Sequence, residues 1–336
     1  MTTHELKKIV NSYEAAHKNG QKAVLATVVA LEGSSYRRPG VRMLLLEDGT
    51  MVGAVSGGCV EKEVYRQAHS VFTTQVPKIM TYDGRYRLGC EGILFILLEP
   101  FRPSPEVITQ FWASIGQRTA FHMRSYFNPH FGEDVNYGSV LEVNETILPL
   151  REGYVIPTDL ESFHQTLPPC FRLVIIGAEH DAVQLCSMAG LMGWEVTVVA
   201  HPKEGKTAMD FPGSTDFVNA EAETLHINAD HQTAIVLMTH SYVKDLQFLM
   251  ALSGHEPAYF GILGPARRRE KLFNELLEQN PDTPLEFIES VHGPAGLELG
   301  AETPQEIALS VLSEILAVIN QKEAISLREK KGRIHA

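Results

Sequence analysis

The sequence lacks a long apolar run and has only four cysteines among its 336 residues. Its longest apolar run, residues 93–98, is far shorter than the roughly 20 residues that cross a bilayer. The first residues also lack the apolar core of a secretory signal. We therefore expect a cytoplasmic protein without a membrane segment.

Positive charge is also scarce. The 29 Lys and Arg residues stand against 41 Asp and Glu residues, for a net charge of -12. Such a surface repels phosphate backbones and anionic lipids. The composition therefore argues against nucleic acid as a partner.

The four cysteines are scattered along the chain. They show no Cys-x-x-Cys pair and no zinc-like spacing with histidine, so we expect reduced thiols. Their positions are Cys59, Cys90, Cys170 and Cys186. An iron-sulfur cluster needs clustered cysteine ligands, which this spacing does not provide.

Two patterns divide the chain. Residues 1–165 alternate short strands with few helices and predict a mixed α+β domain, with a hairpin formed by 41–46 and 51–55 around Glu47-Asp48-Gly49-Thr50. Residues 171–320 alternate strands and helices and predict a Rossmann-like, doubly wound parallel sheet. Residues 321–336 form a basic tail. The fold class is therefore α/β, with the joint at Leu167-Pro168-Pro169.

The first turn of the second domain resembles a dinucleotide fingerprint with its centre altered. Such a loop needs three small residues because backbone amides must approach the pyrophosphate. Here Gly177 and Ala182 fit, but Glu179 occupies the middle position, and Ala200 stands where an acid would bind the ribose. We therefore expect NAD(P) to bind poorly, and a purely structural Rossmann scaffold is the alternative.

Basic side chains follow several strands of this domain. His180 and His240 follow strands predicted to be neighbours, where a ligand crevice is expected, and could bind a metal or anion or transfer protons. His292 lies on a glycine-rich loop. Arg267 and Arg268 begin a helix, where an anion would offset the unfavourable dipole. Hydrogen bonds to nearby carbonyls and a solvated basic face are the respective alternatives.

Glycine-rich loops also interrupt the first domain. The segment from Gly33 to Gly40 offers hydroxyls, amides and guanidiniums suited to a phosphate or pterin-like ligand. The segment Ser56-Gly57-Gly58-Cys59-Val60-Glu61 places Cys59 at a helix N-terminus, which favours thiolate. Cys90, flanked by Gly89 and Glu91, could face the same site. A tight turn with a small buried cysteine is the alternative.

Taken together, these motifs resemble the XdhC/CoxI family, the accessory factors of xanthine dehydrogenase and related molybdenum hydroxylases. The N-terminal matches are Gly33-Ser34-Ser35, Arg38-Pro39-Gly40, Ser56 to Glu61, and Leu88-Gly89-Cys90. The C-terminal matches are Gly177-Ala178-x-His180, Met238-Thr239-His240 with Asp245, Gly261 to Gly264, His292-Gly293-Pro294 through Leu297, and Thr303-Pro304-x-Glu306. This family usually has glycine at the position of Glu179 and aspartate at the position of Ala200.

The resemblance implies a cytosolic chaperone that binds molybdenum cofactor (molybdopterin) transiently, assists its sulfuration and helps insert it into an apo molybdenum hydroxylase. A cysteine desulfurase and a second copy in a homodimer are the further expected partners. The implied cofactor-binding residues are Gly33, Ser34, Ser35, Arg38, Ser56, Gly57, Gly58, Cys59, Glu61 and Cys90, with Gly177, His180, Arg267 and Arg268 in the second domain. Cys59 is expected near molybdenum.

The alternative function is an NAD(P)-dependent oxidoreductase that uses His240 or His292 as acid or base. The scattered cysteines and the length of 336 residues argue against a third function, a xanthine dehydrogenase itself, because that enzyme combines iron-sulfur, flavin and molybdenum domains.

Overall fold

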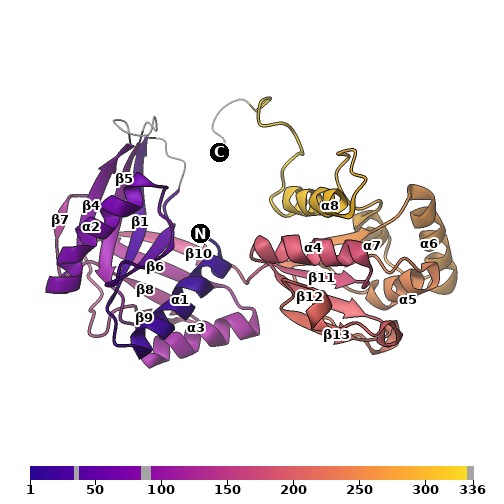
Figure 1. The fold of residues 1–336 in the computed structure, drawn as a ribbon, viewed down its shortest axis with the longest axis horizontal. Coiled ribbons are helices and arrows are strands. Elements are labelled where there is room, and N and C mark those ends of the chain that lie inside the picture. Colours follow the sequence, from indigo (N-terminus) through magenta and orange to yellow (C-terminus); the bar gives the residue numbers. More distant parts are fainter. Residues whose placement is uncertain (34–37, 85–91, 331–336) are drawn as a thin grey trace. The chain divides into compact units, whose positions relative to one another are not determined.

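The computed structural model describes residues 1–33, 38–84 and 92–330. The chain forms two compact units, Met1–Cys170 and Phe171–Ala336 (Figure 1). Among the described residues, no helix is both long and apolar enough to cross a membrane.

The first unit is built on a six-stranded antiparallel sheet. Its order is β3 (Met51–Gly53), β2 (Arg42–Leu46), β1 (Ala23–Gly33), β5 (Gly92–Pro100), β4 (Lys78–Asp83) and β7 (Gly132–Glu133). The predicted hairpin is present, since Leu44 pairs with Val52 across β2 and β3. Helix α2 (Cys59–Thr74) buries Val60, Val64 and Ala68 in a core formed with β1, β4 and β5.

A second, four-stranded antiparallel sheet packs in the same unit. Its order is β10 (Glu161–Leu167), β6 (Phe121–Phe127), β8 (Gly138–Val143) and β9 (Thr146–Pro149). Helices α1 (Thr3–Lys18) and α3 (Pro105–Gln117) bury their apolar faces in a shared core with both sheets. Strand β10 lies where sequence periodicity fades. Its burial alternates from Ser162 to Leu167, but the inward-facing Gln165 is polar, so apolar residues do not alternate in the sequence and the pairing with β6 identifies the strand.

Polar groups are buried between β5 and the second sheet. The Glu99 carboxylate is fully buried and accepts hydrogen bonds from the backbone and hydroxyl of Ser139. Burial raises the pKa of Glu99, although the bonds from Ser139 and the nearby charges of Arg151 and Arg42 oppose that shift. The hydrogen bonds compensate for removing this carboxyl group from water.

The second unit contains one six-stranded sheet. Its order is β13 (Asp216–Asn219), β12 (Glu195–Ala200), β11 (Arg172–Ile176), β14 (Thr233–Leu237), β15 (Tyr259–Ile262) and β16 (Val291–His292). All the pairings are parallel. This is the 3-2-1-4-5-6 order of Rossmann folds. The α/β fold prediction, with a Rossmann-like sheet in the C-terminal half, is confirmed.

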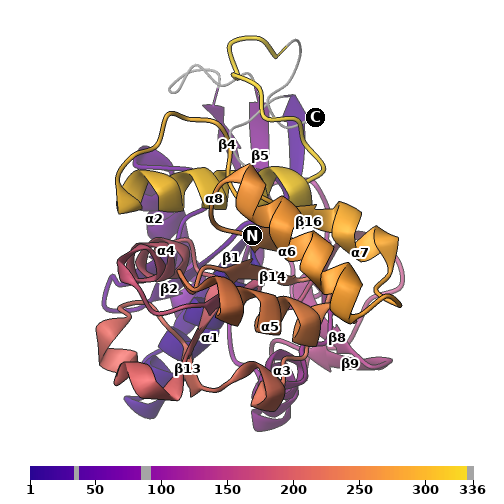
Figure 2. The ribbon, with the colours of Figure 1, turned by 90° about the vertical axis from the view of Figure 1, so that its right-hand side faces the viewer.

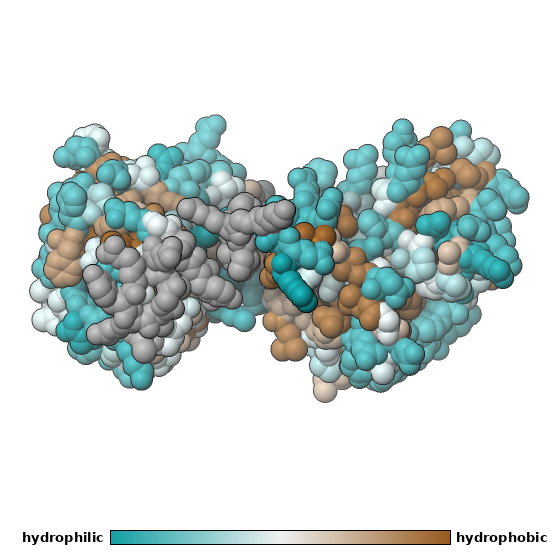
Figure 3. Space-filling model, turned by 90° about the horizontal axis from the view of Figure 1, so that it is seen from above, coloured by the Kyte–Doolittle hydropathy of each residue, from teal (hydrophilic) through white to brown (hydrophobic). Residues whose placement is uncertain are grey.

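Helices cover both faces of this sheet (Figure 2). α4 (His180–Leu191) and α8 (Pro304–Ile319) pack on one face, and α5 (Tyr242–Leu252), α6 (Ala266–Gln279) and α7 (Leu285–Ser290) on the other. The start of α8 is fixed by a capping box between Thr303 and Glu306, as its sequence predicts. Leu309 and Leu316 of α8 are exposed. The face of the second unit that is seen in Figure 3 carries apolar patches.

Candidate functional site

Three connections leave the first sheet at the same end. β1, β3 and β4 run toward this end and β2 and β5 run away from it, because neighbouring strands are antiparallel. At the tips, Gly33 is the register partner of Gly92, and Asp83 is the partner of Ile93. The described strand ends that flank the glycine-rich motifs, Gly33 of β1, Asp83 of β4 and Gly92 of β5, therefore lie at one end of the sheet (Figure 1).

The structure describes some of the predicted residues of these motifs and not others. Ser34, Ser35 and Cys90 lie outside the described residues. Gly33 ends β1 with a φ of 78°, and Arg38 is exposed. Cys59 is the first residue of α2, as expected for a thiol at a helix N-terminus.

The N-terminus of α2 has open backbone amides. Its N-cap residue, Gly58, has a φ of 61° and provides no side-chain hydrogen bond. Gly57 and Gly58 are exposed, and a Cβ atom added to either would meet no atom within 4 Å. Uncapped amides at the start of a helix attract an acceptor or anion. This turn can therefore approach a ligand closely through its backbone.

Glu61 lies in the first turn of α2 and is 9% exposed. Its Oε1 atom accepts a hydrogen bond from the Ser56 amide at 2.9 Å. Its Oε2 atom is buried and has no hydrogen-bond partner among the described residues. The glutamate thus fixes the glycine turn with one oxygen, while its other oxygen is buried without a partner among the described residues.

A buried arginine supports the neighbouring motif. Arg42 donates to the carbonyl of Gly40 at 3.0 Å and to the amide oxygen of Gln165. Gly40 has a φ of 96°, and a Cβ atom there would lie 2.8 Å from the Gln165 amide group. Burial lowers the pKa of Arg42 to about 10. The sequence did not point to this residue, because an arginine within an apolar strand forms no motif.

In the second unit, Gly177 is required by packing. It has a φ of 137°, and a Cβ atom there would clash with the carbonyl oxygen of Met238, the residue after β14. Glu179 is the N-cap of α4 but makes no side-chain capping bond, and both Glu179 and His180 are exposed. The first fingerprint glycine therefore has a structural role whether or not a nucleotide binds.

At the carboxyl edge of this sheet, ion pairs join the segments that follow neighbouring strands. Nε2 of His240 lies 3.1 Å from Oδ2 of Asp181. Asp245, which is 1% exposed, accepts hydrogen bonds from the Thr239 hydroxyl and from Arg268. The predicted residues His240 and Arg268 are therefore near the expected crevice, and each already has a carboxylate partner.

His292 is held by a third carboxylate. Its Nδ1 atom lies 3.3 Å from Oε1 of Glu314 on α8, and its ring stacks on Tyr259. Glu314 also accepts hydrogen bonds from the Tyr259 hydroxyl and from the Gly296 amide. Burial alone raises the pKa of Glu314, but these contacts outweigh it and the net shift lowers the pKa. The loop that follows His292 is thus fastened to α8.

The remaining predicted residue of this edge, Arg267, is exposed. No group of three or more His, Cys, Asp and Glu side chains that could hold a metal ion occurs in the described part of the chain.

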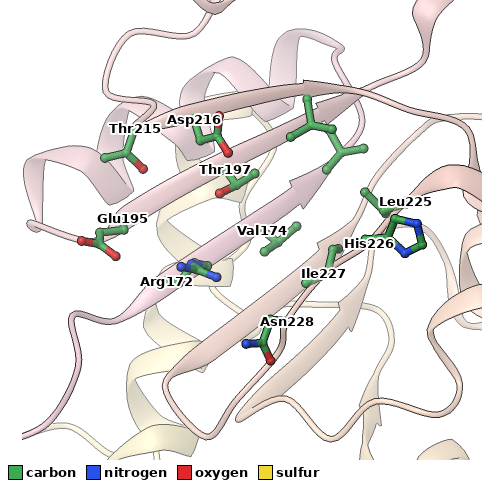
Figure 4. Close-up of a pocket in the computed structure, with 12 residues that line it drawn as sticks. Arg172, Val174, Glu195, Thr197, Thr215, Asp216, Leu225, His226, Ile227 and Asn228 are labelled. Carbon is green, nitrogen blue, oxygen red and sulfur yellow. The ribbon is translucent and has the colours of Figure 1, made fainter. Parts of the chain in front are cut away.

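A separate cavity of about 320 Å³ lies on the face of the second sheet that packs against α5 and α6 (Figure 4). In this fully described region, the connections after β12 and β13 contain only short 3-10 helices, which leave part of the sheet face open. Polar side chains line the cavity together with valines of the core. They include Arg172, Glu195, Thr197, Asp216 and Asn228. Several begin strands, so the cavity lies away from the carboxyl edge.

The architecture defines a two-domain α/β protein whose second domain is a Rossmann fold. The profile of the XdhC Rossmann domain matches residues 173–315, and that of the XdhC and CoxI family matches residues 16–83. The chain belongs to the XdhC and CoxI family, as its motifs predict.

Proteins similar to this chain match it over nearly its full length. A Bacillus subtilis (strain 168) protein, named as a probable subunit of xanthine dehydrogenase, is 28% identical over 90% of this chain and 95% of its own length. The Escherichia coli (strain K12) "molybdenum cofactor insertion chaperone PaoD" is 26% identical over 96% of this chain and 91% of its own. A crystal structure from Bacillus halodurans, described as a xanthine dehydrogenase, has a TM-score of 0.75 and 25% identity and covers 97% of this chain and 98% of its own.

Proposed function

We propose that this chain is an accessory factor that binds molybdenum cofactor and assists its insertion into a xanthine dehydrogenase-type molybdenum hydroxylase. The family and the names of two similar proteins support this role. The observation that carries it is the open turn at the N-terminus of α2. The exposed Gly57 and Gly58 there leave room for a ligand to reach backbone amides.

The residues present fit the chemistry of this cofactor. The amides of the glycine turn suit acceptor or anionic groups, and the exposed Arg38 suits a phosphate. In this proposal Gly33, Ser34 and Ser35 also contact the cofactor, and the thiol of Cys59 lies near the metal. When bound, the cofactor supplies a molybdenum centre held by a dithiolene, for which a thiolate is a suitable soft neighbour.

Two finer parts of the proposal concern partners. The first is that the cofactor is sulfurated while bound to this chain, with a cysteine desulfurase as sulfur donor. The second is that the chain acts as a homodimer. In the second unit, the exposed His180 and Arg267 are the proposed ligand groups, since their neighbours His240 and Arg268 already pair with carboxylates.

The test is to co-produce the full chain with the cofactor and purify it without oxygen. We expect bound molybdopterin in the wild type and about tenfold less in Cys59→Ser, a loss of about 1.4 kcal/mol in binding. Cys186→Ser is the matched control, because Cys186 lies on α4 and is buried in the core of the second unit. Equal content in all three proteins would disprove the thiol role, and no pterin in the wild type would disprove the function.

A further inference from the structure

The Glu61 carboxylate has a hydrogen-bond partner for only one of its two oxygens among the described residues. One oxygen holds the Ser56 amide, and the other is enclosed by protein without a partner among the described residues. A buried acceptor that gains no hydrogen bond loses its hydration without compensation. Burying an unpaired carboxylate oxygen beside a glycine turn therefore needs a reason other than stability.

A second unpaired polar atom lies on the same side of the sheet. The hydroxyl of Tyr82 is buried and has no hydrogen-bond partner within the described ranges. Tyr82 stands next to the end of β4, at the end of the sheet where α2 begins, and shares a core with Val60 of that helix. Two buried polar atoms on this α2-covered face therefore lack partners among the described residues.

The Glu61 carboxylate and the backbone amides of the glycine turn together suit a ligand that has hydrogen-bond donors next to an acceptor. An ionised carboxylate oxygen only accepts hydrogen bonds, from N–H or O–H donors, whereas the backbone amides at Gly57 and Gly58 donate to an acceptor such as a carbonyl oxygen. A 2-amino-4-oxopyrimidine ring presents an amino group, a ring N–H and a carbonyl oxygen in a row. Pterins carry this edge, and carboxylates accept from exocyclic amines of nucleobases in the same manner.

We propose that Glu61 recognises the pterin ring of the cofactor by accepting a hydrogen bond from its amino edge, while the glycine turn of α2 binds its carbonyl side. This assignment rests on the proposed function. It makes Glu61 the residue that distinguishes a pterin from a pteridine without the amino group. Guanine shares the same edge, so a guanine nucleoside is the competing ligand to be tested.

The test uses fluorescence titration of the full chain with pterin and with lumazine, in which an oxygen replaces the amino group. We expect the wild type to bind pterin about tenfold more tightly than lumazine, because a site built for an N–H donor rejects an analogue that lacks it. In Glu61→Gln the amide retains an acceptor for the Ser56 amide but can present a donor instead of Oε2. The preference for pterin should therefore fall to within about twofold.

Glu63→Gln is the matched control, since Glu63 lies on the same helix and pairs with Arg66 at the surface. Its pterin preference should equal that of the wild type. Tyr82→Phe, which removes only the second unpaired atom, provides a further variant if Glu61→Gln unfolds. We expect it to weaken pterin binding about threefold.

The outcomes separate this inference from the proposed function. If anaerobically purified wild type and Glu61→Gln carry equal molybdopterin and show equal pterin preference, the role of Glu61 is wrong and the function stands. If the wild type carries no molybdopterin, the function is wrong. Tenfold tighter binding of guanosine than of pterin would overturn the assignment of the edge to a pterin.

Discussion

The glycine turn of the first unit and the carboxyl edge of the second are both rich in polar groups, but they differ in how those groups are used. At the glycine turn, the α2 amides lack a side-chain cap and one oxygen of Glu61 is unpaired among the described residues. At the carboxyl edge, His240, Arg268 and His292 each lie against a carboxylate. The paired groups fix loops, whereas the open amides and the unpaired oxygen are the groups that we propose for a ligand.

Breaking an ion pair at the carboxyl edge should change the free energy of unfolding more than any other substitution proposed below changes stability or binding. Asp245→Ala removes the acceptor for Arg268 and Thr239 and leaves a cation beside an empty buried position. We expect the free energy of unfolding of the second unit to fall by about 3 to 5 kcal/mol. Urea denaturation measures this change, with the exposed Asp216→Ala as control. Equal stability of the two variants would show that the edge is not structural.

Filling the glycine turn should abolish binding without destabilising the fold. Gly57→Glu adds a side chain where a Cβ atom meets nothing within 4 Å, so the fold tolerates it. The added charge repels anionic groups from the α2 amides, and we expect molybdopterin content to fall more than tenfold, or more than about 1.4 kcal/mol. Analysis of anaerobically purified protein and a thermal unfolding curve give the two readouts. Unchanged molybdopterin content would show that the cofactor does not bind at this turn.

The loop at Glu179, which departs from the dinucleotide fingerprint, allows NAD(P) binding to the second unit to be tested and restored. Calorimetric titration of the wild type with NADH and NADPH should detect no micromolar binding, because Glu179 and Asp181 place negative charge at the N-terminus of α4. The double variant Glu179→Gly and Ala200→Asp restores the usual residues and should bind NADH at least about tenfold more tightly. Micromolar binding by the wild type would instead favour the oxidoreductase alternative with His240 or His292.

The smallest expected effect is on the pH dependence of the free energy of unfolding. The hydrogen bonds to Glu314 outweigh its burial and lower its pKa, so its carboxylate stabilises the fold above the unfolded-state pKa, and this contribution is lost as the pH falls through the folded-state pKa. Glu314→Gln should lose about 1 kcal/mol at neutral pH and lose less on acidification. Denaturation curves at pH 7 and in acid compare the two proteins, and parallel curves would contradict the assignment.

The alternation of strands and helices predicted the Rossmann sheet because buried parallel strands leave strong apolar runs. Strand β10 was not predicted because polar Gln165 occupies an inward-facing position and interrupts the apolar alternation, and β16 was not predicted because it has only two residues. At the candidate site, the motifs indicated Glu61 and His240. The partners Glu314 and Gln165 come from distant elements, so only tertiary packing reveals them.

The most direct test compares one substitution in each unit by one readout. Full-length wild type, Gly57→Glu and His240→Ala are co-produced with the cofactor, purified without oxygen and analysed for molybdenum and molybdopterin. We predict that wild type and His240→Ala carry equal amounts of both and that Gly57→Glu carries less than about a tenth. Loss of the cofactor in His240→Ala with retention in Gly57→Glu would contradict the account.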